Sequence, residues 1–245
     1  MSQLILPQWP QPRSVRSCVT TRHGGVSHSP YDSLNLGLHV GDDPASVHAN
    51  RHRLIELAAL PAAPHWLDQV HGTDVVHLTE MTSYATTNVA DAAYTHASGV
   101  VCSVMTADCL PVLFASRAGD EVAAAHAGWR GLCAGVLENT VDAFSAKPAD
   151  ILAWFGPAIG PLQFEVGMEV REAFVAIDPA ASHAFQPKGS KFLADIYHLA
   201  RLRLQACGVN NVYGGEFCTV TNSTDFYSYR RDVTTGRLAS LIWLI

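Results

Sequence analysis

A polar stretch between two short apolar runs is the feature of this sequence that most restricts its fold. Residues 110–114 (Leu-Pro-Val-Leu-Phe) and 121–125 (Glu-Val-Ala-Ala-Ala) flank residues 115–120, which contain a glycine. Two such runs around a Gly-containing stretch predict a β-hairpin. The hairpin brings the residue before the first run, Cys109, close to the residue after the second run, His126.

Two registers of this hairpin are open. If the turn is Ala118-Gly119, Cys109 faces Gly128 across the ladder; if the turn centre lies one residue earlier, Cys109 faces His126 itself. Either register places Cys109 and His126 roughly 5–8 Å apart. That separation suits two ligands of one metal ion.

A third candidate ligand, His71, lies in a similar glycine-containing string, Gln-Val-His-Gly at residues 69–72. Two imidazoles and a thiolate suit Zn²⁺ with an open fourth position, which is typical of catalytic zinc sites. Counting along the chain does not place His71 relative to the hairpin. Two other interpretations stay open: Cys109 and a histidine form a metal-free nucleophilic pair, or Cys109 is a small buried residue without a chemical role.

Length and composition exclude several classes of protein. The chain has 245 residues, of which 48% are hydrophobic and 16% charged, so we expect one compact domain over residues 1–245. It has neither an apolar run long enough to cross a bilayer nor a signal-type N-terminus. A net charge of −6 without a basic block disfavours nucleic-acid binding. Six cysteines without a C-x-x-C spacing predict reduced thiols and a cytoplasmic location.

Hydrophobic periodicity predicts an α/β (α+β) fold in which mixed β-sheets are packed by helices. One helix is expected to begin at Pro44 with Asp43 as its N-cap. The predicted strands span residues 14–20, 100–114 on either side of Ala107-Asp108, 152–155, 211–214 and 238–244. The other predicted helices span residues 131–144, 166–177 and 192–207.

Four arginines are candidates for binding an anion through their guanidinium forks. Arg22 precedes a glycine pair, Arg130 lies at the start of a predicted helix, and Arg230 lies in an aromatic-rich string; Arg51 is the fourth. The alternative for each arginine is a surface ion pair.

Seven strings of the sequence, in the same order from about residue 13 to the C-terminus, resemble the YfiH-type family, which is also called the laccase-domain or polyphenol-oxidase family. They are residues 21–27, 33–37, 66–72, 106–111, 126–131, 156–160 and 228–232. One departure is that residues 162–163 are Leu-Gln, where many relatives have Cys. Asn35 and Gln69 lie in these strings and join the four arginines as predicted substrate-binding residues.

The resemblance implies a YfiH-like fold and a zinc site at His71, Cys109 and His126, with copper as the alternative metal. It implies phosphorolysis of adenosine, inosine or guanosine to the base and ribose 1-phosphate, with methylthioadenosine phosphorolysis and adenosine deamination as companion activities. The expected partners are a purine nucleoside and phosphate, without a membrane, and the expected unit is a monomer or homodimer.

Two further classes and one residue role stay open. A copper-dependent polyphenol oxidase is disfavoured because the chain contains no His-x-His pair, and a hydrolase would use Cys109 as its nucleophile. Asp108 is a candidate acid or base if the strand before Pro111 is bulged; in a regular strand it points away from Cys109.

Overall fold

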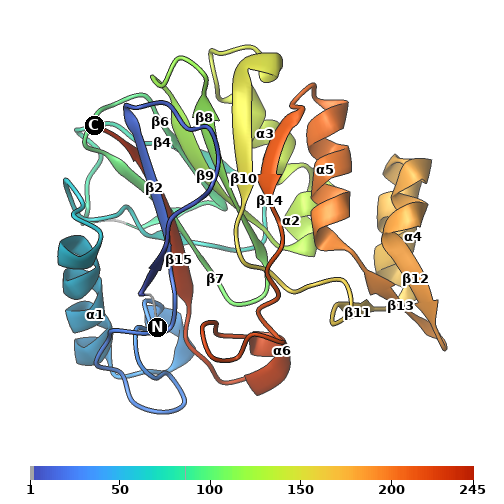
Figure 1. The fold of residues 1–245 in the computed structure, drawn as a ribbon, viewed down its shortest axis with the longest axis horizontal. Coiled ribbons are helices and arrows are strands. Elements are labelled where there is room, and N and C mark those ends of the chain that lie inside the picture. Colours follow the sequence, from blue (N-terminus) through green and yellow to red (C-terminus); the bar gives the residue numbers. More distant parts are fainter. Residues whose placement is uncertain (1–2, 86) are drawn as a thin grey trace.

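The computed structural model describes residues 3–85 and 87–245. Two large β-sheets form the centre of the molecule, with helices outside both of them (Figure 1). The four-stranded sheet has the order β1 (Leu4–Ile5), β2 (Val15–Thr20), β15 (Leu238–Leu244) and β7 (Val101–Thr106). The six-stranded sheet has the order β14 (Asn211–Gly214), β10 (Ile151–Phe155), β8 (Leu110–Ser116), β9 (Val122–Ala127), β6 (Ala92–Thr95) and β4 (Val75–His77).

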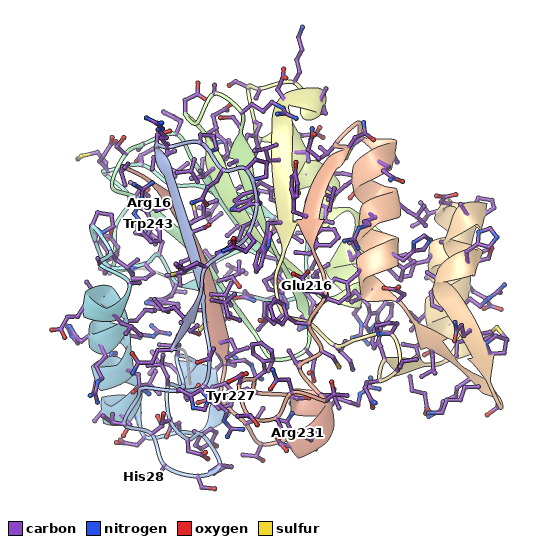
Figure 2. All side chains as sticks on the ribbon, viewed as in Figure 1. Arg16, His28, Glu216, Tyr227, Arg231 and Trp243 are labelled. Atoms are coloured by element: carbon purple, nitrogen blue, oxygen red, sulfur yellow. The ribbon has the colours of Figure 1, made fainter. Side chains whose placement is uncertain are left out.

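Both parallel and antiparallel pairs occur in the six-stranded sheet, as the sequence predicts for a mixed sheet. Strands β10 and β14 are parallel, as are β4 and β6, while the β8–β9 hairpin is antiparallel. In the four-stranded sheet β15 pairs with β2 and β7, which puts Trp243 opposite Arg16 (Figure 2).

The two sheets pack face to face. Because successive side chains of a strand point to opposite faces of its sheet, every second residue lies between the two sheets and the others lie on the outer face. Val104 and Ile242 of the four-stranded sheet contribute to one buried apolar cluster with Leu113 and Ala124 of the six-stranded sheet. The neighbouring residues of β15, such as Leu241, instead belong to the cluster on the outer face of the four-stranded sheet.

Helices cover both outer faces, so the molecule has an α-β-β-α layering (Figure 1). Helix α1 (Pro44–Leu57) packs on the four-stranded sheet through Leu54. Its N-cap is Asp43, whose carboxylate accepts from the N–H groups of Ala45 and Ser46, as predicted. Helices α2 (Trp129–Ala134), α3 (Val136–Asp142) and α5 (Ile196–Ala206) cover the six-stranded sheet.

The remaining elements are short. A three-stranded sheet of β11 (Glu165–Val166), β13 (Lys191–Ala194) and β12 (Phe185–Lys188) lies beside α4 (Met168–Ile177). A parallel pair is formed by β3 (Leu67–Asp68) and β5 (Asn88–Val89). Helix α6 (Tyr229–Asp232) and three 3-10 turns (Leu38–Val40, Pro148–Asp150 and Pro179–Ala184) complete the fold. Within the two described ranges, every helix is too short or too polar to cross a membrane.

The α/β fold of mixed sheets packed by helices is confirmed, but two predicted helices are wrong in detail. The segment 192–207 begins as strand β13, paired with β12 across a turn at Gly189; α5 starts only after Asp195, whose side chain caps the His198 N–H. The segment 131–144 is divided into α2 and α3 by Gly135, which has the left-handed φ of 109°.

Candidate metal centre

The predicted hairpin forms from β8 and β9, and its register is the first of the two predicted. Leu110 pairs with Ala127 and Pro111 with His126, so Cys109 lies opposite Gly128. The turn is wider than Ala118-Gly119 alone, because the Ser116 hydroxyl accepts hydrogen bonds from the backbone N–H groups of Gly119 and of the two residues that follow it. Cys109 and His126 are therefore diagonal neighbours at one end of the ladder.

His71 joins this pair from a loop after β3. Its Nε2 lies 3.7 Å from Cys109 Sγ, and one ligand atom from each of His71, Cys109 and His126 lies within 4.8 Å of the others. A tetrahedral zinc ion with the usual Zn–S and Zn–N bonds separates its sulfur and nitrogen ligands by roughly 3.6 Å. The spacing and the donor types therefore fit a zinc ion with three protein ligands.

A buried carboxylate, Asp91, holds the two histidines. One of its oxygens accepts from His126 Nδ1 at 2.7 Å and from the backbone N–H of His71 at 3.0 Å. The other accepts from the N–H groups of Val70 and Gly72. The bond to Nδ1 leaves His126 Nε2 as the free ring nitrogen, which is the arrangement that metal-binding histidines need.

The backbone around the site is held in a costly conformation. His71 and Asp108 have φ values of 60° and 91°, a left-handed region that costs a non-glycine residue on the order of 1–3 kcal/mol. Asp91 fixes His71 as described. The Asp108 carboxylate accepts from Thr219 Oγ1 at 2.5 Å and from the N–H of Arg230 at 2.6 Å. These bonds compensate for the strain, and they direct Asp108 toward the 219–230 region.

Gly128 provides the space in which the ligands meet. A Cβ atom at this position would lie 2.6 Å from His71 Cδ2 and 3.1 Å from Cys109 Sγ. At Gly131, one turn further along α2, a Cβ atom would lie 2.7 Å from the Gly72 carbonyl oxygen. The glycines of the 126–131 string therefore let α2 approach the His71 loop.

In the metal-free chain, Cys109 and His126 stabilise each other's charged forms. Burial by itself raises the pKa of the Cys109 thiol, but the neighbouring His126 overrides it and lowers that pKa to about 6. Burial likewise acts to lower the pKa of His126, yet Cys109 and Asp91 raise it to about 9. A thiolate is the form of cysteine that binds metals.

Two cavities meet at His71 and Cys109, and His126 lines the larger of them. The larger, about 480 Å³, is lined by His71, Cys109 and His126 together with other residues that include Gln69 and Arg237. The smaller, about 260 Å³, is lined by His71 and Cys109 together with Asp108, Arg130 and Arg230, among others. Tyr229 lines both cavities.

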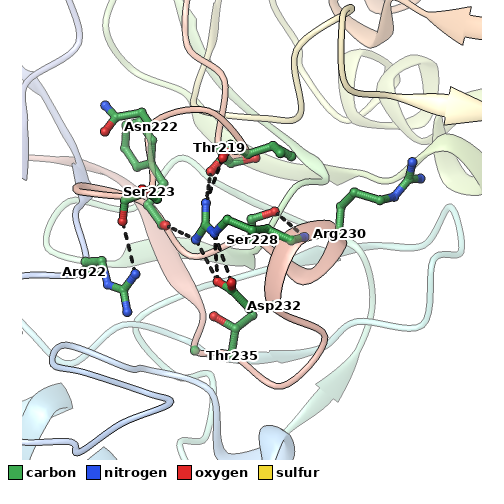
Figure 3. A network of polar contacts seen from close by, with 12 residues as sticks. Arg22, Thr219, Asn222, Ser223, Ser228, Arg230, Asp232 and Thr235 are labelled. Atoms are coloured by element: carbon green, nitrogen blue, oxygen red, sulfur yellow. Dashed lines mark hydrogen bonds and ion pairs between the residues drawn. The ribbon is translucent and has the colours of Figure 1, made fainter.

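The four predicted arginines occupy different places. Arg130 and Arg230 line the smaller cavity. Arg22 donates hydrogen bonds to Asp32 and to the Ser223 carbonyl. In Figure 3 the Arg230 side chain points away from Arg22. Arg51 donates twice to the Leu36 carbonyl and stacks on Trp66. Arg22 and Arg51 are not among the residues that line the two cavities, and all four substrate-binding roles stay predictions.

The two predicted amide side chains hold the backbone. Asn35 is buried, and its Oδ1 accepts from the N–H groups of Gly37 and Arg237. Gln69 lines the larger cavity, but its amide bonds the backbone N–H and carbonyl of Met105. Substrate binding by either residue stays a prediction.

Sequence reasoning missed Asp91 and Arg237. Asp91 lies between two buried alanines, the second of which begins β6, and a carboxylate in such an apolar run is a signal for a hydrogen-bonded or ligating role. Arg237 follows Thr-Thr-Gly and precedes the apolar strand 238–244, a context that does not distinguish it from a loop residue.

Comparisons with known proteins agree with this architecture. The family model described as "Multi-copper polyphenol oxidoreductase laccase" matches residues 16–245. A protein of Escherichia coli K12 named purine nucleoside phosphorylase YfiH is 63% identical over all of both chains. A purine nucleoside phosphorylase of Pseudomonas aeruginosa is 56% identical, over 100% of this chain and 99% of its own.

Two solved structures have the same fold. A Neisseria meningitidis protein superimposes with a TM-score of 0.95 at 50% identity, over 99% of both chains. YlmD from Geobacillus stearothermophilus does so with a TM-score of 0.92 at 34% identity, over 99% of this chain and 96% of that chain.

Fold and site together define a class: an antiparallel sheet stacked on a mixed sheet, with a His–Cys–His cluster at one end of a hairpin. Within that class, the chain belongs to the laccase-domain family that includes the YfiH proteins.

Proposed function

We propose that this protein is a zinc-dependent purine nucleoside phosphorylase. It cleaves adenosine, inosine or guanosine with phosphate to the free base and ribose 1-phosphate. Phosphorolysis of methylthioadenosine and deamination of adenosine are companion activities. The reaction takes place in the cytoplasm, which the six free thiols support, because the cytoplasm keeps cysteines reduced. The functional unit is a monomer or homodimer.

The observation that carries the proposal is the position of the His71–Cys109–His126 cluster at the junction of two cavities. Phosphorolysis needs two substrates beside one reacting centre, and two cavities that share His71 and Cys109 provide for that. The names of the relatives that are 63% and 56% identical support the same substrate class.

The bond changes define what the site must do. A phosphate oxygen forms a bond to C1′ while the bond from C1′ to the purine nitrogen breaks, and the electron pair leaves with the purine, which takes up a proton. The chain contributes by holding the anionic nucleophile against the sugar. A zinc ion held by His71, Cys109 and His126 would supply Lewis acidity and an activated water.

The donor set disfavours a multicopper oxidase. Such enzymes need several imidazole clusters, whereas the described residues contain one group of three histidine, cysteine or carboxylate side chains close enough to share a metal ion. A Cys109-dependent hydrolase is the second alternative, since the thiol lies beside two imidazoles.

A phosphate-dependence assay tests the three reactions against each other. Purified protein, inosine and phosphate are expected to yield hypoxanthine and ribose 1-phosphate, with or without O₂. Unchanged product formation without phosphate, giving free ribose, would establish a hydrolase; an absolute requirement for O₂ would establish an oxidase.

Elemental analysis tests the metal. About one Zn²⁺ per chain is expected in protein purified without added metal, as for a single three-ligand site. His71→Ala, Cys109→Ala and His126→Ala should each lose most of it. Copper in place of zinc, or full zinc occupancy in any of these variants, would contradict the assignment.

A further inference from the structure

Arg237 is brought to the candidate metal centre by strand pairing. It directly precedes β15, and the first residue of β15, Leu238, pairs with Thr106 at the end of β7. The loop that carries Cys109 begins at the next residue, Ala107. Arg237 therefore lines the larger cavity together with Cys109 and His126.

The hydrogen bonds of Arg237 leave one edge of its guanidinium open. Nη1 donates to the carbonyl oxygens of Thr235 and Gly236. Among the described residues, neither Nε nor Nη2 has a hydrogen-bond acceptor, and no carboxylate forms an ion pair with Arg237. Neither atom is a buried donor without a partner, so the free edge is accessible to solvent, and Arg237 is one of the residues that line the larger cavity.

This edge is a matched pair of parallel donors in a partly desolvated place. The Arg237 side chain is half-buried, and burial lowers its pKa, though an arginine stays charged near neutral pH. A planar fork of two N–H donors fits two oxygens of a phosphate, and its charge is screened less in a cavity than on the surface.

The other arginines near the site are less suited to this task. Arg22 and Arg51 use their Nε and Nη2 donors on Asp32 and on the Leu36 carbonyl. Arg230, like Arg237, directs only Nη1 to two carbonyls, those of Gln163 and Glu165, but its side chain is exposed and lines the smaller cavity, to which His126 does not contribute. Arg130 is exposed and lies over the ring of its neighbour Trp129.

Two residues of the 33–37 string hold Arg237 in place. Asn35 Oδ1 accepts its backbone N–H at 2.9 Å. A Cβ atom at Gly37 would lie 2.8 Å from Arg237 Cγ, so glycine at this position leaves room for the Arg237 side chain. The string therefore acts on the site through Arg237, which gives Asn35 a positioning role.

We propose that the free Nε/Nη2 edge of Arg237 binds the phosphate co-substrate, in the same cavity as His71, Cys109 and His126. This inference rests on the proposed phosphorolysis for the identity of the anion. It assigns the phosphate to a residue outside the four arginines that the sequence singles out.

Steady-state kinetics of Arg237→Gln and Arg237→Lys in the zinc-loaded protein test the assignment. Losing a charge-assisted pair of hydrogen bonds is expected to raise the phosphate KM about tenfold to a hundredfold, with the inosine KM changed less than about threefold. Lysine keeps the charge but not the fork, so Arg237→Lys should fall between wild type and Arg237→Gln. Arg53→Gln, on the exposed face of α1, removes the same charge elsewhere and should leave both constants unchanged.

Equilibrium dialysis with radiolabelled inorganic phosphate separates this proposal from the proposed function. If wild type binds phosphate and Arg237→Gln does not, Arg237 is an anion site even where no nucleoside is cleaved. Zinc content and melting temperature, measured on each variant, show whether it is folded and loaded.

Three outcomes would overturn the assignment. One is an unchanged phosphate KM and phosphate affinity in folded Arg237→Gln. The second is an equal rise of the inosine and phosphate KM values. The third is a phosphate-specific defect in Arg130→Gln but not in Arg237→Gln, which would move the phosphate to the smaller cavity.

Discussion

At the scale of single residues, the site depends on side chains that hold other side chains. Asp91 accepts hydrogen bonds from His126 Nδ1 and from three successive backbone N–H groups of the His71 loop. One carboxylate thereby sets the free ring nitrogen of one ligand and the backbone position of another. Mutation of such hydrogen-bond partners of the ligands typically weakens metal binding about 10- to 100-fold.

Asp91→Asn is expected to lower zinc affinity about 10- to 100-fold, because an amide directs an NH₂ group at donors that need an acceptor. Competition with a chelator of known affinity measures this loss. Asp120→Asn is the matched control: its carboxylate accepts from Ser116 Oγ in the hairpin loop, so its zinc affinity should equal that of wild type. Equal zinc affinity in Asp91→Asn and wild type would remove Asp91 from this role.

The Cys109 thiol should show its environment once the metal is removed. Burial alone would raise its pKa, but His126 lowers it to about 6, so the reactive thiolate increases as the pH rises through about 6. In chelator-treated protein, iodoacetamide labelling of the Cys109 peptide, followed by mass spectrometry, should reach half its maximal rate near pH 6. Zinc should protect the thiol, and His126→Ala should shift the midpoint upward. A wild-type midpoint above pH 8 would contradict the Cys109–His126 pairing.

At the scale of elements, the sequence predicts those parts of the site that depend on local pairing. The β8–β9 hairpin follows from two apolar runs, and its register fixes Cys109 relative to His126. The position of His71 follows instead from Asp91, and that of Arg237 from the pairing of β15 with β7, which are far apart in sequence. The predicted helix over 192–207 is wrong for a different reason, because Phe192 pairs with Pro187 in a local hairpin that turns at Gly189, and helical periodicity does not reveal that turn.

The start of α2 is a second element-scale requirement. Gly128→Ala would put a methyl group 2.6 Å from His71 Cδ2, so the His71 ring or the helix must move. The expected result is a clear loss of zinc affinity in chelator competition. The melting temperature of the metal-free protein should change far less, since the displaced ring is exposed. Wild-type zinc affinity in this variant would show that the ligands do not need this close approach.

At the scale of the whole molecule, the two stacked sheets place the ends of β7, β8 and β9 at one edge, and the site is built on that edge. Arg237 and the start of the Cys109 loop adjoin strands of the four-stranded sheet. His126 lies on β9 of the six-stranded sheet, and Asp91 directly precedes β6 of the same sheet. The apolar contact between the sheets, which includes Ile242 and Leu113, therefore sets the relative position of the two halves of the site.

Ile242→Ala tests whether that contact stabilises the fold without forming part of the site. Ile242 is fully buried on β15 between the two sheets, and removing its side chain is expected to cost about 2–5 kcal/mol of unfolding free energy. Urea unfolding of chelator-treated protein measures this cost free of the stabilisation that bound zinc adds. Ile177→Ala, at a position that is 53% exposed on α4, should stay within about 0.5 kcal/mol of wild type.

Because Ile242 lies among apolar side chains rather than at the cluster, folded Ile242→Ala should still bind about one Zn²⁺ per chain. A folded variant that has lost its zinc would show instead that small shifts between the sheets reach the ligands.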